Sequence, residues 1–283
     1  MKNFKVLLIV MMILIIAGCS LEKSSDEKES KVKVAIIGDS ISAGCNPELA
    51  TRAEKYDKRY GYAQMLAGET YDGIAVPSKN IYNIWENAEL KNFSIIGSQA
   101  SEWNKDSSSS ENWHKWDSEF KKVLEFTPDI AVIYLGANDI FAYIGNDGKI
   151  TSEEYIELRT NITGIIEQLK AKNNNIKIVL IGYYDMFDGR SSLAAKASPE
   201  YFAGFADMSS IVVNGNKMIK EIATAEGANF VDIYTPFLNH GYGKALGNTN
   251  AALPLYLTGN LLTFDIHPIT AGHKVIYEKV YST

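Results

Sequence analysis

The sequence predicts an α/β fold built on a doubly wound parallel sheet, with helices on both faces. Short apolar runs of four to eight residues alternate along the chain with segments whose apolar residues recur every three or four positions. Runs of this length are typical of strands that are buried on both faces. The connections between successive runs are long enough for the crossover helices that parallel strands require.

Five segments are expected to be strands, and a small polar or glycine motif follows each of the first three. The five are Lys33–Ile37, Phe93–Ile96, Ile130–Leu135, Ile176–Tyr183 and Asn229–Ile233. Open α/β sheets bind their ligands beyond the carboxyl ends of their strands. We therefore expect the motifs to meet at one edge of the sheet.

Four segments with helical periodicity lie between and after these strands. They are Glu111–Phe126, Ser152–Lys170, a segment from about Ala206 to Glu226, and one from about Ala271 to Val280. The second follows Thr151, which together with Glu154 makes a capping-box pattern. Two long irregular stretches, 99–110 and 239–263, are expected to be loops that overhang the strand ends.

Length and composition indicate an ordinary globular chain. It has 283 residues, of which 46% are hydrophobic and 22% charged. This length allows one large α/β domain, and we see no second set of core elements. The formal net charge is −6, without a patch of Lys and Arg, which argues against nucleic acid as a partner.

The N-terminus predicts export and a lipid anchor. An unbroken apolar stretch of 12 residues, Val6–Ala17, follows two lysines; it is short for a membrane span and fits an export signal. It runs into Ile16-Ala17-Gly18-Cys19, which resembles the lipobox of bacterial lipoproteins. The resemblance implies a signal peptide over residues 1–18 and acyl chains on Cys19. Residues 19–30 then read as a disordered tether and 31–283 as the folded domain. A plain cleavable signal, or a short anchor with a chance cysteine, is the alternative.

The chain has one other cysteine, Cys45. If Cys19 is lipidated, Cys45 has no partner and no disulfide is expected. Because no base motif lies near it, Cys45 is interpreted as a packed thiol.

A serine and a histidine supply the two groups that nucleophilic ester hydrolysis needs first. Ser40, in Gly38-Asp39-Ser40, follows the first strand, and His267 precedes Pro268 and the last helix. Ser40 is a candidate nucleophile and His267 a candidate base. Each motif also has a plain structural interpretation, as a turn and as a helix cap respectively.

Gly97 and Asn138 are candidate donors to the negative oxygen that forms during ester hydrolysis. A glycine lets its backbone N–H approach a ligand closely, and Asn138 offers a neutral side-chain amide. Both are also common turn residues. The functional interpretation is favoured because Ser40, Gly97 and Asn138 each follow a different expected strand.

The order of these motifs resembles the GDSL esterase/lipase family, whose members are also called SGNH hydrolases. Gly-Asp-Ser, a glycine, Gly-x-Asn-Asp and Asp-x-His-Pro follow one another from about Val32 to Tyr281. The resemblance implies a flavodoxin-like, three-layer α/β/α fold with Ser40 as nucleophile and His267 as base. It also implies an oxyanion hole from the amides of Ser40 and Gly97 and the side chain of Asn138. No metal or cofactor is implied.

One position departs from the family pattern. In many members an aspartate lies three residues before the histidine, where this chain has Phe264, and Asp265 lies two before. Either Asp265 reaches the histidine through a turn, or a backbone carbonyl orients His267 and leaves a Ser–His dyad.

The expected function is that of a serine ester hydrolase, lipid-anchored on the extracytoplasmic side of a membrane and acting through an acyl-enzyme. Acetyl or short-chain carboxylic esters, including those on polysaccharide, are the expected substrates, with Trp103 a candidate to stack on a sugar. Trp113 and Trp116 fall on an apolar stripe and are expected to pack in the core. The alternatives are a lysophospholipase or thioesterase of the same family, and a non-catalytic binding lipoprotein on this fold.

Overall fold

The structure is a computed structural model that describes residues 31–75, 77–104, 117–145, 148–247, 256–258, 261 and 264–283. The signal segment 1–18, the tether 19–30 with Cys19, and both Trp113 and Trp116 lie outside the described residues.

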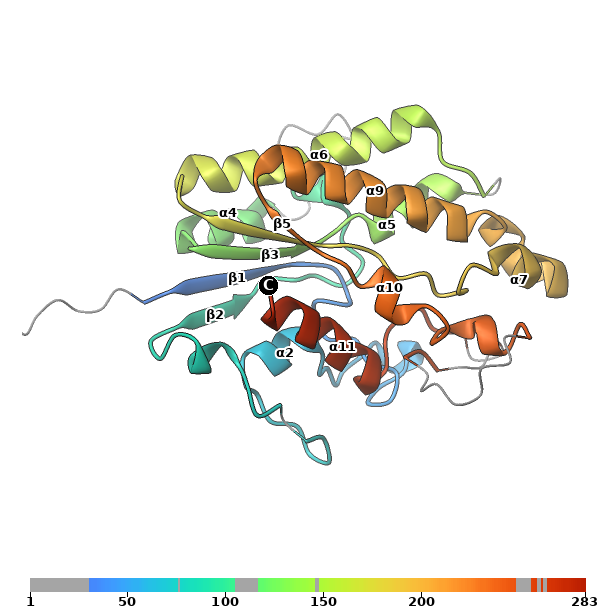
Figure 1. Ribbon diagram of the computed structural model, residues 1–283, viewed down its shortest axis with the longest axis horizontal. Helices are drawn as coiled ribbons and strands as arrows, with labels where there is room; N and C mark the ends of the chain where they lie inside the picture. The colour runs from blue at the N-terminus through green and yellow to red at the C-terminus, as the bar shows by residue number, and fades with distance from the viewer. Residues whose placement is uncertain are drawn as a thin grey trace, which may run out of the picture. The chain divides into compact units, whose positions relative to one another are not determined.

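Five parallel strands form the sheet, as predicted (Figure 1). Their bounds are β1 Lys33–Gly38, β2 Glu89–Asn92, β3 Ile130–Tyr134, β4 Lys177–Ile181 and β5 Asn229–Val231. The strand order β2-β1-β3-β4-β5 is that of flavodoxin-like folds, and every pairing is parallel. This confirms the predicted fold class.

The position predicted for the second strand is wrong. The strand is Glu89–Asn92, which precedes the expected Phe93–Ile96. An edge strand has no need of an apolar run, because its two faces are only partly covered, and Lys91 is exposed. The expected segment still runs along β1, since the amide of Phe93 donates to the carbonyl of Ile36 at 2.9 Å.

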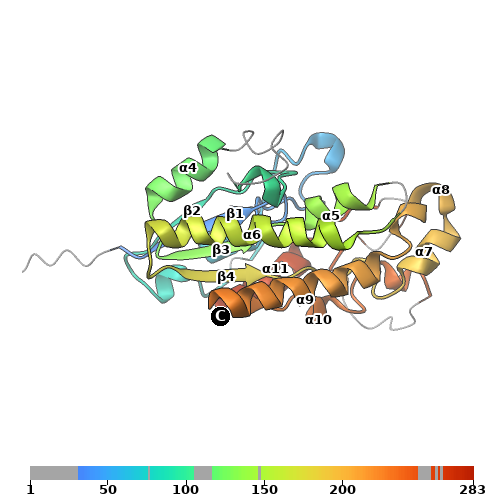
Figure 2. The same ribbon diagram turned by 90° about the horizontal axis from the view of Figure 1, so that it is seen from above.

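Helices cover both faces of the sheet (Figures 1 and 2). On one face lie α4 (Asp117–Phe126), α6 (Ser152–Lys172) and α9 (Met208–Glu226); on the other lie α2 (Tyr62–Leu66) and α11 (Thr270–Tyr281). Shorter α-helices are α5 (Ala137–Ile144), α7 (Ser191–Ala197), α8 (Pro199–Phe202) and α10 (Tyr234–Phe237). Short 3-10 turns span Arg52–Glu54, Ile81–Asn83, Ala100–Glu102, Ala203–Phe205 and Tyr242–Lys244.

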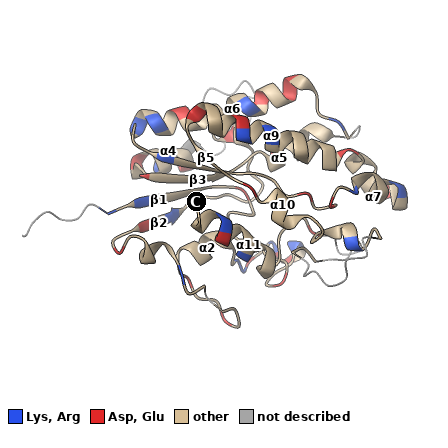
Figure 3. Cartoon of the chain, viewed as in Figure 1, with Lys and Arg blue, Asp and Glu red and all other residues tan. Residues whose placement is uncertain are grey.

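The long helices α6, α9 and α11 agree with the predicted segments to within two residues at each end. Thr151 caps α6 as expected: its backbone N–H donates to Glu154 Oε2 at 2.7 Å, and its hydroxyl accepts from the Glu154 N–H at 3.2 Å. The first part of the helix expected from Glu111 falls outside the described residues. Basic and acidic residues are interspersed along α4, α6 and α9 (Figure 3).

The central strands hold the core. In β1 the side chains of Ile36 and Ile37 are fully buried, and in β3 Val132 and Ile133 are nearly so. Burying each such side chain stabilises the fold by about 1.5–3 kcal/mol. A well-packed centre fixes where each strand ends, and so fixes the start of the loops that carry the candidate residues.

Candidate active site

Ser40 lies in a tight turn directly after β1. The turn closes through the N–H of Ala43, which donates to the carbonyl of Asp39, and the N–H of Cys45, which donates to the carbonyl of Ser40, both at 2.9 Å. Asp39 Oδ1 accepts from the N–H of Ile41 at 2.9 Å and so braces the residue after the serine. Burial raises the pKa of Asp39 to about 7.

His267 reaches Ser40 across 227 positions of sequence. His267 Nε2 lies 2.8 Å from Ser40 Oγ, and the imidazole is mostly buried. A neutral imidazole at this distance can take the proton of the hydroxyl.

Asp265 meets the other nitrogen of the same ring. Its Oδ1 lies 2.6 Å from His267 Nδ1 and also accepts from the His267 backbone N–H at 3.0 Å. The two-residue spacing therefore closes a small turn that brings carboxylate and imidazole together, rather than leaving a backbone carbonyl to orient the ring. Burial alone would raise the pKa of Asp265, but hydrogen bonds from His267 and Tyr56 outweigh it and hold the pKa below its usual value.

Tyr56 is a site residue that the sequence analysis missed. Its hydroxyl donates to Asp265 Oδ2 at 2.6 Å and lies 2.9 Å from His267 Nδ1. It reaches them from a charged loop 209 residues before Asp265, and no spacing or motif signals that contact.

Gly97 and Asn138 both line the same cleft as Ser40: Gly97 lies on the loop after β2, and Asn138 lies in the first turn of α5, which follows β3. Gly97 has φ +79°, which favours glycine, and a Cβ there would meet nothing within 4 Å, so its backbone faces open space. Asn138 Nδ2 donates to the carbonyl of Ser98 at 3.0 Å and makes a longer contact of 3.5 Å with Asp39 Oδ2. The amide thus ties the Gly97 loop to the Ser40 turn, and a substrate oxygen could replace the longer contact.

Asp139 holds the chain that follows Gly97 through hydrogen bonds to its backbone. Its carboxylate accepts from the backbone N–H groups of Ala100 at 2.8 Å and Ser101 at 3.4 Å. Burial raises the pKa of Asp139 to about 6. Since Asp139 lies next to Asn138 in the first turn of α5, this helix start carries one donor and positions the loop of the other.

The five predicted residues line a single cleft of about 630 Å³. They are Ser40, Gly97, Asn138, Asp265 and His267. The aromatic rings of Phe141, Phe205 and Phe264 form part of its wall.

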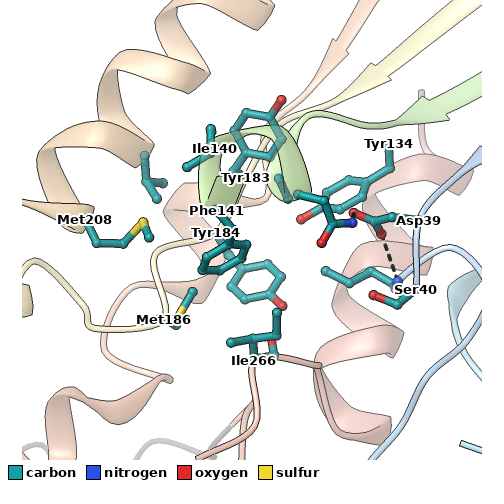
Figure 4. Close-up of a pocket in the computed structure, with 14 residues that line it drawn as sticks. Asp39, Ser40, Tyr134, Ile140, Phe141, Tyr183, Tyr184, Met186, Met208 and Ile266 are labelled. Carbon is teal, nitrogen blue, oxygen red and sulfur yellow. Dashed lines mark hydrogen bonds between the residues drawn. The ribbon is translucent and has the colours of Figure 1, made fainter. Parts of the chain in front are cut away.

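Ser40 also lines a second, much smaller cavity of about 40 Å³ (Figure 4). It shares Ser40, Asn138, Phe141 and Ile266 with the cleft. Figure 4 shows Met186 and Met208 on the side of the cavity opposite Ser40. Asp39 contributes a carboxyl group to the lining, and the remaining residues are apolar or aromatic: Ile41, Tyr134, Ala137, Ile140, Tyr183, Tyr184 and Val212.

Two other predicted roles can be compared with the structure. Trp103 was expected to be open to a sugar, which is wrong: it is fully buried and packs edge-on against Phe120, with ring centroids 6.1 Å apart. Cys45 is buried, and burial raises the pKa of its thiol to about 12, so it is a packed thiol. Within the described ranges, no group of three or more His, Cys, Asp or Glu side chains is arranged to hold a metal ion.

Comparison with known proteins gives one family match and several structural likenesses. The model of a family described as the GDSL-like Lipase/Acylhydrolase family matches residues 36–275. A search of curated proteins found no match.

Several solved structures resemble the chain. An acetyl xylan esterase is 17% identical with a TM-score of 0.52, over 89% of this chain and 98% of that one. A catalytic mutant of an acetylxylan esterase from Geobacillus stearothermophilus is 17% identical with a TM-score of 0.54, over 89% and 94%. An extracellular lipase from Streptomyces rimosus is 13% identical with a TM-score of 0.51, over 89% and 99%. At these identities the likenesses establish the fold alone.

Proposed function

The chain belongs to the GDSL-like lipase/acylhydrolase family and is a hydrolase of ester bonds, and we propose that Ser40 is its nucleophile. The observation that carries this proposal is the 2.8 Å contact between Ser40 Oγ and His267 Nε2 in a cleft that Gly97 and Asn138 also line.

The proposed reaction has two halves. Ser40 Oγ attacks the ester carbonyl while His267 Nε2 takes its proton, and Asp265 stabilises the imidazolium that forms. The carbonyl oxygen becomes negative and accepts from the backbone N–H groups of Ser40 and Gly97 and from Asn138 Nδ2. The alcohol leaves with the proton from His267. A water that His267 deprotonates then hydrolyses the acyl-enzyme and restores Ser40.

Labelling with a fluorophosphonate probe tests this proposal directly. The folded protein is expected to be phosphonylated, and peptide mass spectrometry to find the label on Ser40. Heat-denatured protein is the control and stays unlabelled, because the reaction needs the His267 base. A folded protein that resists the probe would favour the alternative of a binding lipoprotein on this fold.

The two cavities support a short acyl group on a bulky alcohol. About 40 Å³ accommodates only a few heavy atoms, such as an acetyl or propionyl group. The cleft of about 630 Å³ has the size of an ordinary ligand site, and its aromatic wall suits the face of a sugar. We propose acetyl and short-chain esters, including those on polysaccharide, as substrates. The two acetylxylan esterases among the structural likenesses are in keeping with this class.

Shortening Met208 is expected to relax the limit on acyl length. Met208 is buried at the side of the small cavity, so Met208→Ala adds room for additional methylenes. The ratio of kcat/KM for p-nitrophenyl butyrate to that for the acetate should rise on the order of tenfold, since one methylene in a fitted pocket is worth 10–200-fold.

Met218→Ala is the matched control, because Met218 is buried on the same helix and does not line the cavity. It carries a similar core-truncation penalty but should leave the ratio unchanged. If both variants leave it unchanged, the small cavity does not hold the acyl group. High wild-type activity on long-chain acyl esters would favour the lysophospholipase alternative.

We also propose that the mature protein is held on the outer side of a membrane by acyl chains on Cys19. The supporting observation is the apolar stretch that ends in Ile16-Ala17-Gly18-Cys19. Among the helices that the structure describes, none has the length and apolar content needed to cross a bilayer. Metabolic labelling of bacteria with an alkyne fatty acid should mark the wild-type chain and Cys45→Ala, but not Cys19→Ala. Label on Cys19→Ala would mean that the lipid is attached to another residue. An unlabelled wild-type chain would favour the alternative of a plain cleavable signal or a short anchor.

A further inference from the structure

The hydroxyl of Tyr56 is placed between the two side chains that act behind Ser40. It donates to Asp265 Oδ2 at 2.6 Å and lies 2.9 Å from His267 Nδ1. The tyrosine ring meets the imidazole edge-on, with centroids 4.7 Å apart, and the residue is 4% exposed. Neither the motifs nor the proposed reaction steps assign a role to this residue.

An uncommon backbone brings Tyr56 to this place. Lys55 and Tyr56 have φ values of +54° and +47°, so two consecutive residues with side chains adopt the left-handed region. The turn before them is braced by Glu54, whose Oε2 accepts from the N–H of Thr51 at 2.7 Å. Arg59 Nε holds the far side by donating to the carbonyl of Tyr56 at 3.0 Å. Backbone of this kind persists where the surroundings enforce it, and it concentrates at functional sites.

The short spacing between Asp265 and His267 explains what the hydroxyl contributes. Asp265 Oδ1 is occupied by two donors of His267, its backbone N–H at 3.0 Å and Nδ1 at 2.6 Å. Without Tyr56, the other oxygen, Oδ2, would lose its hydrogen bond in a side chain that is only 12% exposed. The hydrogen bond from Tyr56 fixes the plane of the carboxylate. Burial raises the pKa of Tyr56 far above its usual value, so the hydroxyl keeps the proton that it donates.

Two other tyrosines hold the same loop by its backbone only. The hydroxyl of Tyr242 accepts from the N–H of Asp265 at 2.9 Å and donates to its carbonyl at 2.8 Å. Tyr184 donates to the carbonyl of Ile266. These contacts fix the chain, whereas Tyr56 bonds the carboxylate itself.

We propose that Tyr56 is a positioning residue that holds the Asp265 carboxylate against His267 Nδ1 and thereby keeps Nε2 directed at Ser40. This inference rests on the proposed function. It also accounts for how a carboxylate two residues from the histidine can orient it: the spacing supplies one fixed oxygen, and Tyr56 fixes the other.

Tyr56→Phe tests the proposal, because it removes the hydroxyl and keeps the ring against His267. With p-nitrophenyl acetate, kcat should fall roughly 10–100-fold, the range found when the hydrogen-bond partners of metal-ligating histidines are removed, while KM stays within about twofold. Tyr60→Phe is the matched control. Tyr60 is equally buried and donates to the carbonyl of Glu69 at 3.0 Å, away from the site, so its loss should leave kcat within about twofold.

A double-mutant cycle with Asp265→Ala separates positioning from packing. If Tyr56 acts through the carboxylate, Tyr56→Phe should lower kcat and the fluorophosphonate labelling rate less than about threefold in the Asp265→Ala background. An equal fold loss in both backgrounds, or an unchanged kcat in the single variant, would overturn the proposal. Ser40→Ala, measured alongside, distinguishes the two proposals. If Ser40→Ala is active, the assignment of Ser40 as nucleophile is wrong. If Ser40→Ala is inactive and Tyr56→Phe is fully active, only the role proposed for Tyr56 is wrong.

Discussion

Ser40→Ala is expected to lower kcat for ester hydrolysis roughly 10⁵–10⁶-fold, as removal of the nucleophile does in serine hydrolases. The change removes one oxygen, whose hydrogen bond is to His267 Nε2, and it leaves the backbone N–H of Ser40 in place. The turn after β1 is held by backbone bonds and by Asp39, so the fold should persist. Hydrolysis of p-nitrophenyl acetate measures the rate, and the melting temperature verifies that the fold is intact.

Ser42→Ala is the control for this loss. Ser42 lies two residues further along the same turn, and its hydroxyl is hydrogen-bonded to that of Tyr62 at 2.6 Å in the core. Losing this buried bond should lower the melting temperature, because it leaves the Tyr62 hydroxyl without a partner, but it should leave kcat within about tenfold. If Ser40→Ala kept more than about a hundredth of the wild-type kcat, Ser40 would not be the nucleophile.

The central part of the fold could be predicted because burial leaves a direct trace in the sequence. Strands β1, β3 and β4 are covered on both faces, so their apolar runs give their positions to within two residues at every end. The edge strand β2 has no apolar run. Glu89, Lys91 and Asn92 are typical of a loop, so the strand was predicted at the apolar residues that follow them.

The candidate site was predictable where it depends on strand ends. Ser40, Gly97 and Asn138 follow strands whose carboxyl ends lie at one edge of a parallel sheet, so topology alone brings them together. The sheet topology does not predict the position of Tyr56, because that position is set by a loop with two left-handed residues. Trp103 was misjudged because an aromatic residue in a polar stretch looks exposed, although a short 3-10 turn carries it into the core.

The role of Asp265 could not be decided from spacing, since the reach of a carboxylate two residues from a histidine depends on the local turn. In the structure the N–H of His267 donates to Asp265 Oδ1, and this short ring holds the carboxylate under the imidazole. Phe264, three residues before the histidine, packs in an aromatic cluster. Its ring stacks on Phe187 with 5.8 Å between centroids and meets Phe202 edge-on.

Asp265→Ala is therefore expected to lower kcat roughly 10³–10⁴-fold, less than the loss of Ser40, because the serine and the oxyanion donors remain. Without the carboxylate, the imidazolium loses its negatively charged partner at Nδ1, and the neutral hydroxyl of Tyr56, 2.9 Å away, is left to hold this nitrogen. KM should change little, and the fluorophosphonate labelling rate should fall together with kcat.

Returning a carboxylate at the preceding position should fail to restore this activity. In Phe264→Asp/Asp265→Ala the new carboxylate would start from a backbone position whose side chain faces the rings of Phe187 and Phe202. It would therefore have to turn away from these rings to reach His267 Nδ1, and a carboxylate left against them without a partner is unfavourable. We expect kcat as low as in Asp265→Ala, and a lower melting temperature. Recovery of more than about a tenth of wild-type kcat would mean that the loop refolds freely around the histidine, and that the two-residue turn is not what orients it.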